Sequence, residues 1–211
     1  MVRDPAWRSS GASVTIRRAT IDDLDAMRRV CLLTGDSGAD ATGRWSDDGL
    51  IPDVYLEPYL RYPDGLAWVV DVGAGPIGYV IAVADTADFV AWWNRSWVGE
   101  FVTRHGRTTD HDDEKWLFTG GVHPDLMLAS AENTGYAAHL HIDLLPQAQG
   151  RGLGRELLRT LGRELDHRGV PGVHLRVGEA NVGAAAFYRR LGFDSPEPYV
   201  MTSPSSRLAR A

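Results

Sequence analysis

The chain has 211 residues, 44% of them hydrophobic, and a formal net charge of −6 at pH 7. This length suits one domain with a sizeable core, the acidic balance argues against a general nucleic-acid binder, and no apolar run approaches the ~20 residues of a membrane span. Cys31 is the only cysteine, which excludes an internal disulfide, and residues 1–10 lack the apolar core of a signal peptide, so we expect a cytoplasmic protein with no membrane or nucleic-acid partner.

The N-terminal part predicts a strand, a helix and a long loop. Residues 14–18 read as a short strand, and Thr20 can cap a helix whose first turn is acidic, as the helix dipole favours. Cys31 lies on the apolar face of that helix, where we expect a buried side chain rather than a nucleophile. Residues 36–49 are polar and rich in glycine, which indicates a loop. Their carboxylates fail the EF-hand spacing, and the histidines of residues 105–114 match no zinc pattern, so no metal site is expected.

A hairpin and a long excursion come next. Residues 66–72 and 77–83 read as strands joined by Gly-Ala-Gly-Pro, a turn signal. Residues 86–104 are expected to be helical, and they concentrate the aromatic side chains Phe89, Trp92, Trp93, Trp97 and Phe101. These aromatics either pack over the sheet, form an oligomer contact or line one wall of an acceptor pocket. Residues 120–135 are expected to be irregular.

The stretch from residue 138 to residue 167 organises the rest of the chain. Residues 138–145 alternate with the period of a strand, and Pro146 ends it because proline has no N–H to donate. One strand face carries Leu140, Ile142 and Leu144, and the other carries His139, His141 and Asp143. Leucines then recur at helical spacing from Leu153 to Leu165, with Arg and Glu between them, which indicates an amphipathic helix.

The turn between that strand and that helix suits an anion. Gly150, Gly152 and Gly154 remove the side chains that would hold a ligand away from the backbone. The start of the helix adds free N–H groups and a positive dipole end, and Arg151 and Arg155 add charge for a diphosphate. A second interpretation is that glycine lets the helix pack closely on the sheet. The turn is no Walker loop, since no Lys-Ser/Thr pair follows, and Arg155 replaces the third glycine of the dinucleotide fingerprint.

The C-terminal part predicts a strand, a helix and an edge strand. Residues 173–177 form the strand, and Asn181 is the expected cap of a helix that Gly192 ends. Residues 199–202 read as a final edge strand, and residues 203–211 as a frayed tail.

Two motifs stand about 30 residues apart in this half of the chain. Residues 149–154 read Gln-Gly-Arg-Gly-Leu-Gly, and residues 181–193 read Asn-Val-Gly-Ala-Ala-Ala-Phe-Tyr-Arg-Arg-Leu-Gly-Phe. The first resembles the Q/R-x-x-G-x-G/A signature, and the second the closing N-x-x-A-x-x-x-Y-x-x-L-G-F helix, of the GNAT superfamily of acetyl-CoA-dependent N-acetyltransferases. The resemblance covers roughly residues 66–84 and 136–202.

This resemblance implies a fold and a domain organisation. We expect residues 1–211 to form a single N-acetyltransferase domain of α/β (α+β) class, with a core at residues 14–202 and a long insertion at residues 85–135. Its GNAT fold would be a mixed central sheet of about six to seven strands flanked by helices.

Three further segments are similar to a narrower group. Residues 17–20 (Arg-Arg-Ala-Thr), residues 31–38 (Cys-Leu-Leu-Thr-Gly-Asp-Ser-Gly) and residues 139–146 (His-Leu-His-Ile-Asp-Leu-Leu-Pro) resemble the acetyltransferase-like domain at the C-terminus of O-GlcNAcases and its stand-alone bacterial homologues. The domain attached to animal O-GlcNAcases is regarded as a pseudo-acetyltransferase. Here the cofactor signature is complete, so the resemblance implies retained acetyl-CoA binding.

The GNAT resemblance also implies roles for single residues. Leu144, with Leu145 adjacent, corresponds to backbone N–H groups that face the thioester carbonyl beside a bulge in the central strand. Asn181 corresponds to the residue that hydrogen-bonds the pantetheine arm, and Tyr188 to the acid that protonates the leaving thiolate. The pyrophosphate would be bound by Gln149, Gly150, Arg151, Gly152, Leu153, Gly154 and Arg155.

The general base is the part of the family pattern that this sequence lacks. The usual glutamate or histidine would fall at or beside Ala138, which cannot titrate. We expect Asp143 to serve instead because it is nearest the expected thioester, with His141 and His139 on the same strand face as substitutes. The alternative is that Asp143 hydrogen-bonds one of these histidines for structure alone.

Three functions are compatible with the sequence. The first is an acetyl-CoA-dependent transferase that acetylates a primary amine of a small molecule or peptide, and the second is an acyl-CoA-binding pseudo-acetyltransferase with a regulatory or interaction role. The third is a nucleotide-binding oxidoreductase fragment with Glu179 as ribose ligand, which needs more parallel βαβ units than the sequence offers. An acidic surface favours cationic amines, without separating histone tails, polyamines, aminoglycosides and amino-acid derivatives.

Overall fold

The computed structural model describes residues 13–211 and contains a seven-stranded mixed sheet in that range. The strand order is β1-β2-β3-β4-β5-β7-β6, and every neighbouring pair is antiparallel except β4 with β5. The strands are β1 (Thr15–Arg18), β2 (Leu66–Asp71), β3 (Pro76–Val83), β4 (Ala138–Leu144), β5 (Gly172–Arg176), β6 (Asp194–Glu197) and β7 (Val200–Pro204). The predicted fold class is confirmed. A single parallel pair is too few for the doubly wound sheet of the oxidoreductase hypothesis.

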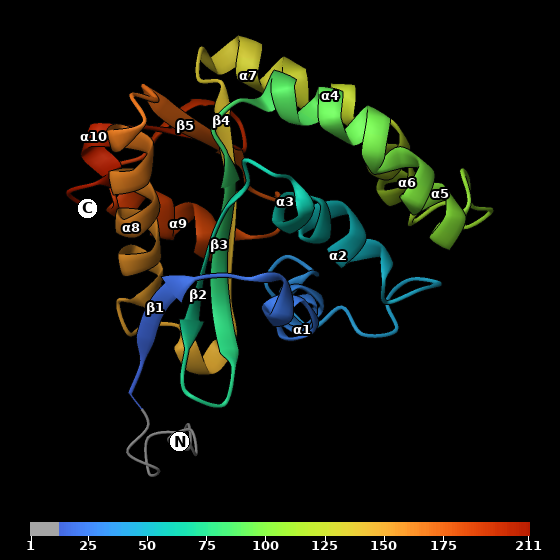
Figure 1. Cartoon of the computed structure of the whole chain (residues 1–211), viewed down its shortest axis with the longest axis horizontal. Coiled ribbons are helices and arrows are strands. Elements are labelled where there is room, and N and C mark those ends of the chain that lie inside the picture. Colours follow the sequence, from blue (N-terminus) through green and yellow to red (C-terminus); the bar gives the residue numbers. More distant parts are fainter. Residues whose placement is uncertain (1–12) are drawn as a thin grey trace.

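Helices cover both faces of the sheet (Figure 1). They are α1 (Leu24–Thr34), α2 (Leu50–Tyr55), α3 (Glu57–Arg61), α4 (Thr86–Ser96), α5 (Val98–His105), α6 (Lys115–Val122), α7 (Leu128–Thr134), α8 (Leu153–His167), α9 (Val182–Arg190) and α10 (Ser205–Leu208). In Figure 1, α8, α9 and α10 lie on one side of the sheet, and α1, α2 and α3 lie on the other.

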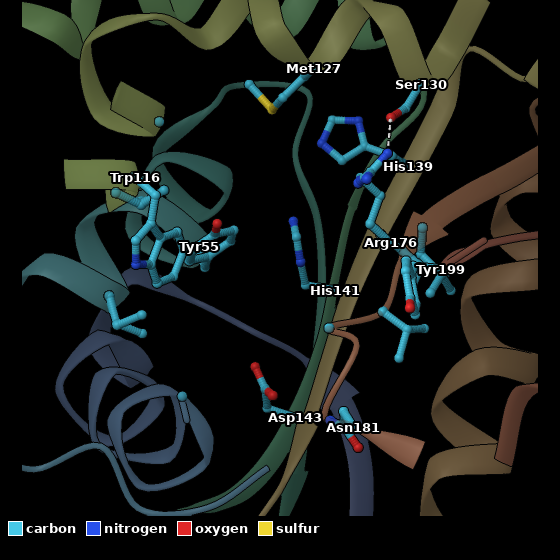
Figure 2. Close-up of a pocket in the computed structure, with 18 of the residues that line it drawn as sticks. Tyr55, Trp116, Met127, Ser130, His139, His141, Asp143, Arg176, Asn181 and Tyr199 are labelled. Atoms are coloured by element: carbon cyan, nitrogen blue, oxygen red, sulfur yellow. Dashed lines mark hydrogen bonds between the residues drawn. The ribbon is translucent and has the colours of Figure 1, made fainter. Parts of the chain in front are cut away.

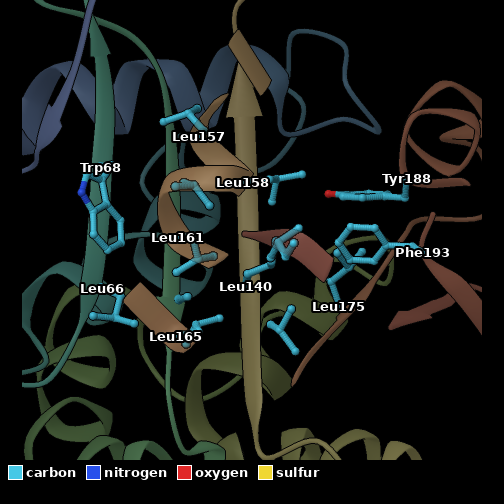
Figure 3. Packing of buried hydrophobic residues seen from close by; sticks show 14 of the residues in the cluster. Leu66, Trp68, Leu140, Leu157, Leu158, Leu161, Leu165, Leu175, Tyr188 and Phe193 are labelled. Carbon is cyan, nitrogen blue, oxygen red and sulfur yellow. The ribbon is translucent and has the colours of Figure 1, made fainter. Parts of the chain in front are cut away.

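The sheet separates two hydrophobic clusters because successive side chains of a strand point to opposite faces. On β3, Val80 and Ala82 belong to the cluster that the buried leucines of α8 complete, whereas Tyr79 and Ile81 belong to the cluster of α1 to α6. Figure 3 shows the first cluster, with the leucines of α8 packed against β2 and β4. Leu140 of β4 joins it as predicted.

The edge that β4 turns towards β5 is open for more than half of its length. These parallel strands pair only through Ala138 with Val173 and His139 with His174. The antiparallel pairing of β4 with β3, by contrast, continues to Leu144 opposite Gly78. Beyond His139, the described residues give β4 a strand partner on the β3 side alone.

Three expectations about connecting segments are wrong. Residues 120–135 are not irregular, because α6, a 3-10 turn (Pro124–Met127) and α7 occupy most of them. The strand predicted at residues 199–202 is present as β7, but it is not the edge strand, because β7 pairs with both β5 and β6 and β6 forms the edge. Residues 203–211 are no frayed tail, because α10 packs on α8 and Leu208 is buried. In these segments the local sequence pattern is weak, and tertiary packing decides which helices and strands form.

Other expectations are confirmed or fall outside the described range. Cys31 is a buried free cysteine. The predicted helix at residues 86–104 is present as α4 and α5, which meet at Trp97. The interpretation of residues 1–10 lies outside the described residues. From residue 13 onwards, no helix combines the length and apolar character needed to cross a membrane.

Candidate active site

Two cavities meet at the open edge of β4. The glycine cavity, about 620 Å³, lies between the turn of residues 149–154 and α9. The histidine cavity, about 900 Å³, is lined by His139, His141 and His174. Residues that line both cavities are Thr34, Ser37, Gly38, Asp143 and Asn181. A ligand in one cavity can therefore meet a ligand in the other beside Asp143.

Two glycines of the turn leave the backbone open to the glycine cavity. Gly150 (φ 69°) and Gly152 (φ 79°) adopt the left-handed conformation that side chains disfavour. A Cβ atom at either position would meet no atom within 4 Å. Gly152 is the N-cap of α8, so the unpaired N–H groups of the first helical turn lie here. This arrangement suits a diphosphate.

Gly154 has a different role. A Cβ atom there would lie 3.0 Å from Leu144 Cδ1 and 3.0 Å from Phe187 Cζ, so this glycine permits close packing of α8 against β4 and α9. The close-packing interpretation is therefore correct for Gly154, whereas the anion-binding interpretation stays a prediction for Gly150 and Gly152.

The backbone of Leu144 faces the open edge of β4. The N–H of Leu145 donates to Ile77 O at 3.0 Å, so the alternation of antiparallel pairing directs the N–H and C=O of Leu144 to the opposite edge. There, Gln149 Nε2 donates to Leu144 O at 2.8 Å. The β3–β4 register is continuous, without the expected bulge. A ligand carbonyl bound between the separated ends of β4 and β5 would meet the N–H of Leu144. The N–H of Leu145 already donates to Ile77 O.

Asn181 caps α9 as predicted. Its Oδ1 accepts from the N–H of Ala184 at 3.0 Å. A Cβ atom built on Gly38 would lie 3.5 Å from Asn181 Nδ2, so the amide nitrogen faces the loop after α1 at the junction of the cavities. Since Oδ1 is used by the cap, Nδ2 is the atom of the Asn181 amide that can donate a hydrogen bond to a ligand.

Tyr188 is buried on the same helix and also lines the glycine cavity. Its ring centroid lies 5.3 Å from that of Phe187 and 5.2 Å from that of Phe193. Figure 3 shows the rings of Tyr188 and Phe193 side by side. Burial, reinforced by the charge of Asp143, raises the pKa of Tyr188 well above its usual range. Its hydroxyl therefore stays protonated at neutral pH.

The structure brings most of the predicted cofactor residues together. Those that line the glycine cavity are Leu144, Gln149, Gly150, Gly152, Gly154, Arg155, Asn181 and Tyr188. Leu145, Arg151 and Leu153 are not part of its lining. Ser37 and Gly38 complete it from the loop after α1, a contribution that sequence reasoning missed because it depends on how α1 packs beside β4.

Asp143 is held by a tyrosine rather than by a histidine. Tyr79, directly opposite it on β3, donates its hydroxyl to Asp143 Oδ2. Burial raises the pKa of Asp143 to about 6, although hydrogen bonds from Tyr79 and Thr34 act to lower it. Asp143 consequently titrates close to neutrality and does not hydrogen-bond His139 or His141 in the described structure.

A chain of hydrogen bonds connects the two histidines of β4. Thr86 Oγ1 lies 2.5 Å from Ala137 O and 2.7 Å from His139 Nδ1. The Tyr59 hydroxyl lies 2.9 Å from His139 Nε2 and 3.0 Å from His141 Nε2. Burial lowers the pKa of both histidines, that of His141 to about 4, so both are neutral at neutral pH.

This chain assigns the tautomers of the histidines. Because a carbonyl only accepts, the Thr86 hydrogen goes to Ala137 O, and Thr86 must accept from His139 Nδ1–H. His139 Nε2 then accepts from the Tyr59 hydroxyl, whose oxygen accepts from His141 Nε2–H. The remaining lone pair of His141 is on Nδ1.

The walls of the histidine cavity come largely from the insertion and the short helices before it. Figure 2 shows Tyr55 and Trp116 across the cavity from Arg176 and Tyr199, with His141 between them. The Tyr55 ring lies 6.0 Å from the Trp116 ring and 5.5 Å from the His141 ring, between centroids. The sequence analysis did not predict these partners, because it assigned no element to the stretch that contains Trp116 and expected the chain from residue 120 to be irregular.

The aromatic side chains of residues 86–104 have mainly a structural role. Phe89, Trp93, Trp97 and Phe101 are buried in the cluster of α1 to α6. Core packing is therefore confirmed. Trp93 also lines the histidine cavity, and the use of that cavity as an acceptor pocket stays a prediction. Among residues 13–211, no group of three or more His, Cys, Asp or Glu side chains is arranged to hold a metal ion.

Comparison with known proteins identifies acetyltransferases. The model of the acetyltransferase (GNAT) family matches residues 117–193. The ribosomal protein bS18-alanine N-acetyltransferase of Salmonella typhimurium is 45% identical over 58 residues, which are 28% of this chain and 39% of the relative. Its Escherichia coli K12 counterpart is 43% identical over 58 residues. The match thus spans well under half of these curated relatives.

Solved structures extend the similarity to nearly the whole chain. The crystal structure of SsHAT is 37% identical with a TM-score of 0.82, covering 92% of this chain and 98% of that one. PaiA N-acetyltransferase from Thermoplasma acidophilum, solved with coenzyme A, has a TM-score of 0.56 at 15% identity, covering 91% and 99% of the two chains. At that identity the likeness concerns the fold.

Proposed function

The chain belongs to the GNAT family of acetyltransferases, and from this premise we propose that it is an acetyl-CoA-dependent N-acetyltransferase for a primary amine. The observation that carries the proposal is the meeting of two cavities at Asp143, on the open edge of β4. The glycine cavity would hold the cofactor, and the histidine cavity would hold the amine. The GNAT match and the relatives that acetylate amines support this assignment.

The residues of the glycine cavity fit acetyl-CoA. The open backbone at Gly150 and Gly152, with Arg155 beside it, would bind the diphosphate. Asn181 Nδ2 would bind the pantetheine arm, and the N–H of Leu144 would polarise the thioester carbonyl. When bound, acetyl-CoA supplies the acetyl group as a thioester.

Transfer needs a neutral amine and a proton for the departing thiolate. Asp143 would accept the amine proton, since it lines both cavities and its pKa of about 6 leaves it ionised at neutral pH. His141 would accept a hydrogen bond at Nδ1 and orient the amine. Tyr188 would donate the proton to the thiolate, because its raised pKa keeps the hydroxyl protonated.

The first test concerns cofactor binding. We expect Gly152→Asp to weaken acetyl-CoA binding at least about tenfold more than Gly152→Asn does. Asn and Asp tolerate the left-handed conformation similarly, so the pair differs chiefly by one negative charge where the diphosphate would lie. Isothermal titration with acetyl-CoA measures both variants. Equal affinities would remove this turn from the cofactor site.

The second test concerns turnover. Purified protein with acetyl-CoA and a panel of primary amines should release free CoA, followed with a thiol reagent. If the protein binds acetyl-CoA but releases no CoA with any amine of the panel, the pseudo-acetyltransferase alternative is favoured. The feature that motivates this alternative is Ala138, which cannot titrate.

The narrower grouping is part of the same proposal. We infer from the motifs at residues 17–20, 31–38 and 139–146 that the chain belongs with the stand-alone homologues of the O-GlcNAcase C-terminal domain. The 37% identity to SsHAT over nearly the whole chain is compatible with that grouping.

A further inference from the structure

We propose that Arg176 is a carboxylate-binding residue of the histidine cavity, and that the acceptor is a primary amine that also carries a carboxylate, as an amino acid does. The inference rests on the proposed function, because it takes the histidine cavity to be the acceptor site.

The position of Arg176 places it beside the reaction centre. It is the last residue of β5, two residues after His174, which pairs with His139. Alternate residues of a strand share a face. Arg176 therefore projects to the same face as His174 on β5, and His141 projects to the same face as His139 on β4. Arg176 and His141 therefore face each other across the gap where β4 and β5 separate. Figure 2 shows both side chains at the cavity.

The charge of Arg176 is not neutralised by the protein. Of the residues that line the histidine cavity, Arg176 alone is lysine or arginine. Within residues 13–211 it forms no ion pair, and its hydrogen bond to Ser130 Oγ is long, at 3.5 Å. The nearby carboxylate of Glu179 instead accepts from the Tyr199 hydroxyl, which raises the pKa of Tyr199. A guanidinium in this state favours a carboxylate ligand.

The field of this guanidinium reaches into the cavity. Burial lowers the pKa of His174, and the positive charge of Arg176 lowers it further. Burial raises the pKa of Tyr55, and the same charge opposes that rise. His174 is on β5 and Tyr55 ends α2 on the opposite wall. The Arg176 side chain is itself exposed, and an anion bound to it would lie where this residue lines the cavity.

The rest of the cavity suits an apolar body. The rings of Tyr55 and Trp116 and the side chain of Met127 line the wall across from Arg176. Such aromatic walls favour planar or aliphatic groups. The cavity thus offers three sites in one space: an apolar wall, a cation, and the pair His141 and Asp143 for the amine. An amino acid with an apolar side chain matches all three.

The test compares ligands that differ only at the carboxylate. Tryptophan, tryptophanamide and tryptamine share an indole and a primary amine, and isothermal titration into the CoA-loaded protein measures their binding without any turnover. We expect tryptophan to bind at least about tenfold more tightly than the other two, since a hydrogen bond between two charged groups is stronger than one between neutral groups. The same comparison of acid with amide is made for phenylalanine and leucine, whose apolar side chains are smaller than that of tryptophan.

The matched variants are Arg176→Gln and Arg163→Gln. Arg163 is an exposed arginine of α8 that does not line the cavity. Arg176→Gln should abolish the preference for the acid and Arg163→Gln should keep it. Equal binding of acid and amide, an unchanged preference in Arg176→Gln, or no binding by any of the three acids would overturn the inference. Because acetylation of tryptamine is scored separately by CoA release, a failed carboxylate site and a failed transferase give different results.

Discussion

Asp143 carries the largest share of the proposed chemistry. It lines both cavities, and Tyr79 fixes its carboxylate. A base works best when its pKa is near the working pH. The value of about 6 for Asp143 meets this condition better than the value of about 4 for His141. The structure therefore supports the choice of Asp143 over His141, on grounds that the sequence did not contain.

The first prediction concerns the pH dependence of catalysis. As pH rises through about 6, Asp143 loses its proton, so kcat/KM should rise with an inflection near that pH. Asp143→Asn should lower kcat by roughly two to four orders of magnitude and abolish the inflection, while acetyl-CoA affinity stays similar. Steady-state rates across a pH series check this. His141→Gln is the comparison variant, and an inflection that persists in Asp143→Asn but vanishes in His141→Gln would move the role to His141.

The second prediction concerns Tyr188. Tyr188→Phe keeps the ring that packs on Phe187 and Phe193 but removes the hydroxyl hydrogen. We expect turnover to fall at least about tenfold, with acetyl-CoA affinity and melting temperature little changed. Single-turnover rates with a working acceptor measure the effect. Near-normal turnover in the variant would show that the hydroxyl of Tyr188 has no part in protonating the thiolate.

At the scale of elements, the sequence predicted what depends on local pattern. The alternation of residues 138–145 and the leucine spacing after Leu153 correctly placed β4 and α8 on the two sides of the glycine turn. The cap of α9 by Asn181 followed from residue type alone. These features depend on a few neighbouring residues, so a single sequence contains them.

The predictions that were wrong or missing concern features that depend on contacts between segments distant in the sequence. The tail after Ser203 has no clear periodicity, yet it contains α10, which packs on α8 at Gly162, where a side chain would clash with it. The bond of Leu145 to Ile77, which removes one expected oxyanion donor, is set by the register of β3 with β4. Trp116 reaches the cavity only because α6 forms and packs against α2. None of these contacts leaves a pattern in either segment by itself.

The third prediction tests the packing of α10 on α8. A Cβ atom on Gly162 would lie 2.5 Å from Ala209 N and 2.6 Å from Leu208 C, so Gly162→Ala must displace α10. We expect a loss of roughly 1–3 kcal/mol in the free energy of unfolding, despite the better helix propensity of alanine. Urea denaturation measures it.

Gly99→Ala is the control for that experiment. Gly99 lies in α5, and a Cβ atom there would meet nothing within 4 Å. This variant should leave stability unchanged or raise it by up to about 1 kcal/mol. Equal effects of the two substitutions would mean that α10 does not constrain Gly162.

At the scale of the whole molecule, a buried charge cluster joins the insertion to the helices around the site. Asp53 of α2 and Glu57 of α3 are almost fully buried, and both contact Arg28 of α1 and Arg104 of α5. His105 Nε2 lies 2.8 Å from Asp53 Oδ2. The cluster holds α2, whose Tyr55 forms part of the cavity wall, against elements distant in the sequence. Removing one partner of such a cluster leaves buried charge uncompensated.

The last prediction is the acid dependence of folding that this cluster causes. Burial acts to raise the pKa of Asp53, but hydrogen bonds from His105 and Arg28 outweigh it and bring the pKa down to about 2 from 3.8. A carboxyl with a depressed folded-state pKa stabilises the fold above its unfolded pKa, and this contribution is lost as pH falls through the folded one. Between pH 4 and pH 2 the loss should be about 2 kcal/mol.

Urea denaturation of wild type and Asp53→Asn at a series of pH values isolates this contribution. Asp53→Asn should be less stable than wild type at neutral pH, and the difference should shrink as pH falls from 4 to 2, because the wild-type carboxyl loses its charge over that range. Asp112→Asn is the control, since Asp112 is exposed and its partner Lys115 is a surface residue, where ion pairs contribute little. A difference between wild type and Asp53→Asn that stays constant across this range would contradict the depressed pKa and leave the cluster without a role in acid stability.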